Sequence, residues 1–119
     1  MVLLEDLRTY SLGLSGVTES IKWGHDLCFC VGDKMFLVAG LDVQPVHASF
    51  KTDLDQFDRL ITLPGYSPAP YLARHHWVMV HDITRIARAD WEAHIDHAYA
   101  LIFSKLPARI KIKINSKIG

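Results

Sequence analysis

Apolar side chains recur at helical spacing, three or four residues apart, in three stretches of the chain. The first spans residues 3–14 and has two acidic side chains in its first turn, where they complement the helix dipole. The second begins at Thr52 with a capping-box-like pattern and is ended by the Pro-Gly pair at residues 64–65. The third spans residues 90–106, with an aspartate as candidate N-cap and a proline directly after it. The pattern therefore predicts three helices.

Shorter apolar runs have the spacing and length that are typical of β-strands. Residues 26–31 and 34–39 flank a Gly-Asp pair, which predicts a hairpin. Residues 46–51 alternate, so that the even-numbered apolar side chains are expected to build core and the odd-numbered polar ones to form the other face. Residues 76–81 have the continuous apolar pattern of a strand that is buried on both faces. A short extended piece is expected before it, near residues 71–72.

Two segments have weaker patterns. Residues 14–25 show no regular period and are predicted to be a connection. Residues 110–114 read Ile-Lys-Ile-Lys-Ile, which has the period of a strand. We expect this end of the chain to pair with the edge of the sheet, or to remain loose and pair with another chain.

The order of these elements predicts a two-layer α+β domain, in which helices pack on an antiparallel sheet in the order α-β-β-β-α-β(β)-α. A chain of 119 residues is long enough to bury such a core without disulfides or metals. We expect a single domain at residues 1–107, followed by a basic C-terminal tail at residues 108–119.

The charge is unevenly distributed, although 13 basic and 13 acidic residues give a net charge of zero. Residues 1–96 hold 8 Lys and Arg against all 13 Asp and Glu, a charge of −5. Residues 97–119 hold no acid and five cations, namely Lys105, Arg109, Lys111, Lys113 and Lys117. Such an end is either an arm that binds phosphate or a solvated end that folds back on the acidic body, and the small number of charges favours the second.

The cellular location is suggested by what the sequence lacks. No apolar run reaches the roughly 18 to 20 residues that span a bilayer, and Glu5 and Asp6 interrupt the start, where a signal peptide would be apolar. Cys28 and Cys30 are spaced too closely for the usual zinc or CxxC motifs, so we interpret them as buried thiols in a reducing compartment. We expect a cytoplasmic protein that needs no membrane, metal or cofactor.

Several short motifs follow one another along residues 3–107. They are LSGVTE at 14–19, VGDKMF at 31–36, SFK at 49–51, YLARHHW at 71–77, IDHAY at 95–99 and LP at 106–107. Their order and spacing resemble those of the MmcQ/YjbR family of small bacterial proteins, in which the second and fourth motifs read VGGKMF and HLNKRHW. The resemblance implies an α+β fold of the kind grouped with secretion-chaperone-like and frataxin-like shapes.

The resemblance also implies a non-enzymatic DNA-binding role, because members of this family are commonly labelled DNA-binding. The candidate contacts are Lys51, Arg74, His75 and His76 for phosphates, Tyr71 or Trp77 for base stacking, and Lys111 and Lys113 as a basic arm. Ala73 stands where the family pattern has asparagine, so any contact that depends on that amide is lost. The zero net charge and the acidic body argue against this role.

Two other classes of function stay open. A protein-interaction or chaperone-like module, including a self-associating homodimer, would use the polar face of the sheet or the alternating tail. Seven histidines raise an enzyme or a metal site, with His94 and His97 on one face of the last helix. However, no HExxH, glycine-rich phosphate loop or nucleophile-elbow motif is present. We therefore expect no catalytic residues.

Overall fold

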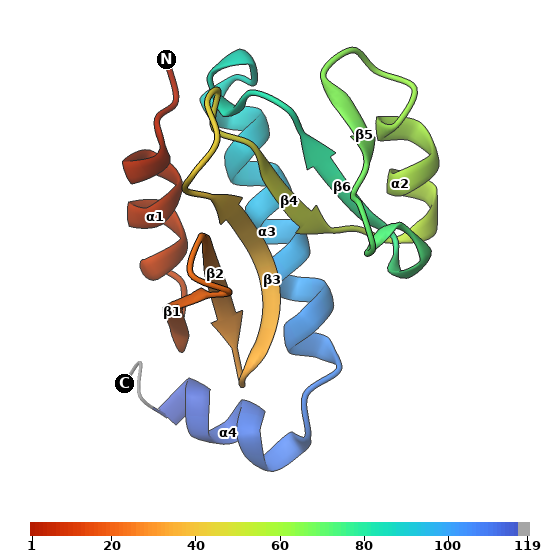
Figure 1. Ribbon diagram of the computed structural model, residues 1–119. Helices are drawn as coiled ribbons and strands as arrows, with labels where there is room; N and C mark the ends of the chain where they lie inside the picture. Colours follow the sequence, from red (N-terminus) through yellow and green to blue (C-terminus); the bar gives the residue numbers. More distant parts are fainter. Residues whose placement is uncertain (117–119) are drawn as a thin grey trace.

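The computed structural model describes residues 1–116 and has an α+β fold (Figure 1). Two 3₁₀ turns are labelled η. The elements are α1 (Leu4–Leu12), β1 (Val17–Lys22), β2 (Asp26–Val31), β3 (Lys34–Gly40), β4 (Ala48–Lys51), α2 (Leu54–Leu60), β5 (Tyr66–Pro68), η1 (Ala73–His75), β6 (Trp77–Val80), η2 (Ile83–Arg85), α3 (Arg88–Ser104) and α4 (Ala108–Ser116). The six strands form one antiparallel sheet in the order β1-β2-β3-β4-β6-β5. The predicted fold class is confirmed.

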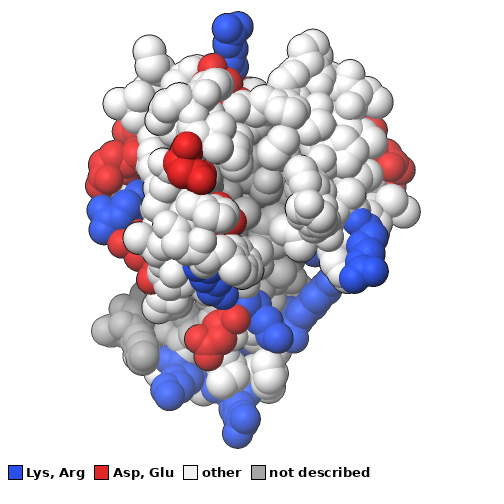
Figure 2. All heavy atoms as spheres, in the orientation of Figure 1, with Lys and Arg blue, Asp and Glu red and all other residues white. Residues whose placement is uncertain are grey.

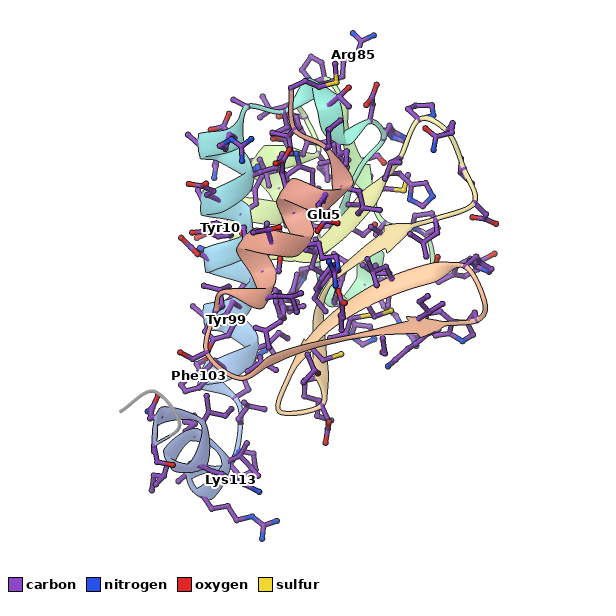
Figure 3. The ribbon with its side chains drawn as sticks, turned by 90° about the vertical axis from the view of Figure 1, so that its left-hand side faces the viewer. Glu5, Tyr10, Arg85, Tyr99, Phe103 and Lys113 are labelled. Carbon is purple, nitrogen blue, oxygen red and sulfur yellow. The ribbon has the colours of Figure 1, made fainter. Side chains whose placement is uncertain are left out.

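Two helices cover one face of the sheet. The long helix α3 packs across β2, β3 and β4, and α1 lies beside it against β1. Figure 3 shows these two helices side by side, and the Tyr10 hydroxyl of α1 joins them by donating to the Asp96 carboxylate of α3 at 2.8 Å. The helix α2 packs against β5 and β6 at the far edge. The sheet therefore has one face under α3 and one face that α3 leaves uncovered.

The core lies between the sheet and α3. Phe29, Leu37, Phe50 and Val78 are neighbours across four strands, and all four are fully buried. Phe36 is also fully buried, although it directly precedes Leu37. The register of β2 and β3 shifts here. Phe29 lies opposite Leu37 but Cys30 lies opposite Met35, so Phe36 has no partner. This β-bulge lets two consecutive side chains enter the core.

The prediction of a connection at residues 14–25 is wrong, because Val17–Lys22 is the edge strand β1. Its residues are half-buried or exposed, and only Val17 and Ile21 are apolar. An edge strand with so few apolar residues has no clear alternating pattern, although it pairs with β2 along its whole length. Glu19 further fixes it to α1 through an ion pair with Arg8 at 2.7 Å.

The predicted strand at residues 110–114 is also wrong, because these residues belong to helix α4. Ile110 and Ile114 are four residues apart, so they share a helix face, and Ile114 is buried in the core. Gly32 makes this packing possible: its φ is +57°, and a Cβ there would lie 2.7 Å from a methyl group of Leu106. The described part of the tail is thus a docked helix, while Lys117 lies outside the described residues.

Several predicted boundaries also shift. The short extended piece is β5 at residues 66–68, not near Tyr71, whose φ is +65°. Asp53, not Thr52, caps α2 by accepting a hydrogen bond from the Gln56 amide at 2.8 Å. The helix α3 begins at Arg88, so the predicted N-cap Asp90 lies in its first turn. These errors of one to a few residues leave the order of the predicted elements unchanged.

Candidate functional site

The loop that the sequence singled out is held by the end of β4. The Lys51 amine donates a hydrogen bond to the backbone carbonyl of His75. The amide and the hydroxyl of Thr52 both donate to the carbonyl of His76, at 2.9 and 2.6 Å. Burial lowers the pKa of Lys51, and the nearby positive charge of Lys105 lowers it further. Lys51 therefore both fixes the loop and lies close to a second cation.

The hydrogen bond from Lys51 brings the backbone of the turn η1 next to its amine, and Arg74 and His75 of this turn are exposed. His76 differs, since its backbone is left-handed with a φ of +61° and its ring meets Phe57 at 5.7 Å in an edge-on contact. Of the candidate contacts in this loop, Arg74 and His75 are therefore open to a partner, whereas His76 is half-buried.

The two aromatic candidates for base stacking are placed very differently. Tyr71 is 98% exposed and carries its ring on the surface. Trp77 is 5% exposed, because it begins the strand β6 inside the sheet. Only Tyr71 is free to stack on a base.

Unpaired cations gather at one end of the molecule, which we call the basic end. Lys51 lies close to Lys105, and α4, which follows Lys105, packs against the β2–β3 turn through Leu106 and Ile110. The basic end comprises Lys34, Lys51, Arg74, Lys105, Arg109, Lys111 and Lys113. Within residues 1–116 none of these seven forms an ion pair with a carboxylate. Figure 2 shows that most of the Lys and Arg side chains on this face lie in its lower half, around α4.

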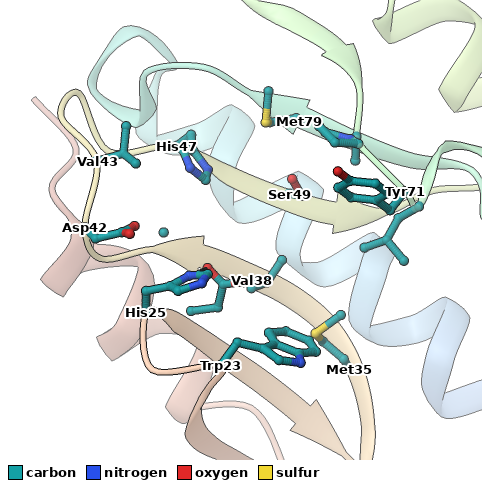
Figure 4. A pocket seen from close by; sticks show the side chains of 15 residues that line it. Trp23, His25, Met35, Val38, Asp42, Val43, His47, Ser49, Tyr71 and Met79 are labelled. Atoms are coloured by element: carbon teal, nitrogen blue, oxygen red, sulfur yellow. Dashed lines mark hydrogen bonds and ion pairs between the residues drawn. The ribbon is translucent and has the colours of Figure 1, made fainter.

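A cavity of about 750 Å³ occupies the face of the sheet that α3 leaves uncovered (Figure 4). Its floor is formed by Val38, Ser49 and Met79, which are neighbours across β3, β4 and β6, together with Met35 of β3. Residues 69–72, before η1, form one wall. The floor offers mostly apolar and polarisable surface, with one hydroxyl group.

The opposite wall of the cavity carries polar side chains. The Nδ1 atom of His25 lies 3.0 Å from the Asp26 carboxylate, and Asp42 and His47 come from the loop between β3 and β4. A Cβ on Gly40 would lie 2.6 Å from the His47 ring, so this glycine makes room for the imidazole. In Figure 4 the side chains of His25, Asp42 and His47 lie together at one end of the cavity, and Tyr71 lies at the other.

The sequence reasoning missed this cavity as a site. Its only signal was the alternation in the third predicted strand, which placed His47 and Ser49 on the face away from the core. Trp23, which lines the cavity, belongs to the segment that was predicted to be a connection. The residues that line the cavity come from separate loops and strands, so no helical or strand periodicity in the sequence relates them to one another.

The two histidines of α3 have different environments. His94 is buried and stacks on Phe50 with a centroid distance of 4.7 Å, and its Nε2 lies 2.9 Å from the Tyr66 hydroxyl. Burial lowers the pKa of His94 to about 4, so its ring is neutral at neutral pH. His97 is exposed, and its Nε2 lies 3.0 Å from the Asp53 carboxylate. The pair therefore does not form a common site.

Three further features of residues 1–116 bear on function, namely metal ligands, membrane spans and thiols. No group of three or more His, Cys, Asp or Glu side chains in this part of the chain could hold a metal ion. None of its helices is long and apolar enough to cross a membrane. Cys28 and Cys30 are buried free thiols, and burial raises the pKa of both.

Comparison with known proteins identifies the family. The YjbR family model matches residues 12–101, which is most of the chain. The chain belongs to the YjbR family. The match confirms the family that the motifs indicated. No curated protein matches the sequence.

Solved structures share this YjbR fold. A Deinococcus radiodurans protein described by the family-model domain DUF419 has a TM-score of 0.87 and 20% sequence identity, over 97% of this chain and 89% of that one. A protein from Pseudomonas syringae has a TM-score of 0.72 and 14% identity, over 85% of this chain and 99% of that one. At these identities the likeness is one of fold.

Proposed function

We propose that this YjbR-family protein is a non-enzymatic DNA-binding protein, and that its basic end contacts the phosphates. The observation that carries the proposal is the gathering of seven cations, from four segments of the chain, without a carboxylate partner within residues 1–116. Elsewhere in these residues Arg8, Arg85 and Arg88 are paired with acids, whereas Lys22 and Arg59 are also without an ion pair. Cations that are left unpaired in the folded protein are available to an external anion.

The electrostatics of Lys51 support this proposal. Lys105 lies close enough to lower the pKa of Lys51, so the two positive charges repel each other in the free protein. A phosphate group placed between them would remove that repulsion. The exposed ring of Tyr71 lies on the same loop as Arg74 and is available to stack on an unpaired base.

The proposal is tested by fluorescence anisotropy with a labelled DNA duplex, from about 50 mM salt upwards. We expect the logarithm of the binding constant to fall linearly with the logarithm of the salt concentration, because each phosphate contact releases counterions. Lys113→Gln should reduce the magnitude of the slope by about 1, the effect of losing one phosphate contact.

A matched control is Arg85→Gln, which also removes one exposed cation. Arg85 lies at the end of the molecule opposite to Lys113 (Figure 3), so this change should leave the slope unaltered. An absence of binding at about 50 mM salt, where phosphate contacts are strongest, would reject the proposal. Equal effects of the two substitutions would show that the cations act only through net charge.

A further inference from the structure

We propose that the cavity on the uncovered sheet face binds a small organic cation with a bulky apolar body. This inference does not rest on DNA binding, because none of the seven cations of the basic end lines the cavity, although Tyr71 borders it and lies on the same loop as Arg74. Three features of the cavity carry it, namely its apolar floor, its two exposed aromatic rings and the sign of its charge.

The size and the floor of the cavity suit a small molecule. Its volume of about 750 Å³ lies within the roughly 300–1,000 Å³ of typical ligand pockets. Val38 and the thioethers of Met35 and Met79 present apolar, polarisable surface. Methionine side chains adapt to irregular ligand shapes because they are unbranched and flexible. Ser49 adds one hydroxyl group at the centre of the floor.

Two large aromatic side chains border this floor and are exposed to solvent. Trp23 is 68% exposed and Tyr71 is 98% exposed. Both have left-handed backbones, with φ values of +55° and +65°. Bulky residues rarely adopt this conformation, and such strain is concentrated at ligand-binding and other functional sites. Their ring faces provide the surface to which organic cations bind through cation–π contacts.

The charge of the lining determines the sign of the ligand. Asp26 and Asp42 both line the cavity, and no Lys or Arg does. Asp26 is engaged by His25, whereas Asp42 forms no ion pair within residues 1–116. Figure 4 shows the Asp42 side chain at one end of the cavity, between His25 and His47. An apolar anion would meet repulsion here, and a cation would meet attraction.

Tetraphenylphosphonium and tetraphenylborate provide a direct test, because they share a shape and carry opposite charges. Binding is followed by NMR of ¹³C-methyl-labelled methionine. The chain has only three methionines, and Met35 and Met79 line the cavity whereas Met1 does not. We expect the phosphonium to shift the Met35 and Met79 signals and to leave Met1 in place. The borate should bind at least about tenfold more weakly.

Two exposed side chains are then changed without disturbing the core. Asp42→Asn should weaken phosphonium binding about threefold to tenfold, and Tyr71→Ala by a similar factor through loss of the cation–π contact. Asp58→Asn is the matched control, because Asp58 is an exposed acid on α2 that does not line the cavity. Equal or tighter borate binding, unshifted Met35 and Met79 signals, or equal effects of Asp42→Asn and Asp58→Asn would each overturn the proposal.

Discussion

The two faces of the sheet are formed by neighbouring residues of the same strands, but they differ in almost every property. The face under α3 presents Phe29, Leu37, Phe50 and Val78, which are fully buried. The uncovered face presents Val38, Ser49 and Met79, which line a cavity. In a two-layer fold the covered face provides most of the stability, so the other face is free to bind a ligand. Substitutions at adjacent positions can test this division.

The largest effect is expected at Phe50, on the covered face. Phe50 is fully buried, stacks on His94 and meets Trp91 edge-on at 5.8 Å. Phe50→Ala should lower the free energy of unfolding by about 3–5 kcal/mol, because it leaves a cavity in the core. The neighbouring Ser49 points to the uncovered face, and Ser49→Ala should cost less than about 1 kcal/mol. Urea unfolding of both variants measures the difference, and similar losses would contradict the division of the faces.

A pH effect should follow from His94, which is also buried on the covered side. Its pKa is about 4 in the folded protein and 6.5 in the unfolded chain. Between these values the unfolded state binds more protons, so stability falls as the pH is lowered from about 6.5 to 4. The loss should reach about 3 kcal/mol.

Acidic groups begin to add to this loss at the lower end of the range, so the His94 effect is obtained by difference. The pKa values of Asp6, Glu19, Asp53 and Asp82 are lowered by their hydrogen bonds, and their stabilisation is also lost in acid. His94→Gln keeps a polar partner for Tyr66 but removes the titrating ring. Urea unfolding between pH 4 and 7 should show a weaker pH dependence in this variant. Parallel curves for the variant and the natural chain would disprove the role of His94.

The smallest effect on stability is expected from a Val→Ala substitution, which can be made on each face of the sheet. Val78 is fully buried beside Phe50 on the covered face, whereas Val38 is half-buried in the floor of the cavity. Val78→Ala should cost about 2 kcal/mol, and Val38→Ala about 1 kcal/mol or less, because the cavity already exposes part of its surface. Thermal unfolding of the two variants compares these losses of stability directly. A larger loss at Val38 would mean that the uncovered face is also part of the core.

The sequence predicted those parts of the fold that depend on neighbouring residues. The helices α1, α2 and α3 and the β2–β3 hairpin have local periods or turn residues that determine them. The strand β1 was missed because its stability comes from pairing with β2 rather than from its own apolar residues. The helix α4 was mistaken for a strand because its packing partner, the turn at Gly32, is more than 70 residues away in the chain.

The candidate site was predictable to a smaller extent. The motif at residues 71–77 and the cationic end of the chain drew attention to Arg74, Lys111 and Lys113, and the structure shows that Lys51 binds the turn to which Arg74 belongs. That the amine of Lys51 binds a backbone carbonyl could not be inferred from residue types. The cavity needs residues from β3, β4, β6 and three loops to meet on one face, which only the three-dimensional arrangement reveals.

The β-bulge at Phe36 has a consequence beyond the core. Side chains of a regular strand point to opposite faces when they are separated by an odd number of positions, so Met35 and Val38 would lie on opposite sides of β3. The unpaired Phe36 reverses the phase of the alternation, and both side chains therefore reach the floor of the cavity. A single extra residue in one strand thus sets the inside and outside of the molecule along β3. Deleting that residue would leave Met35 two positions from Val38 in a regular strand, so both would stay on the cavity face and the core would lose one phenyl ring.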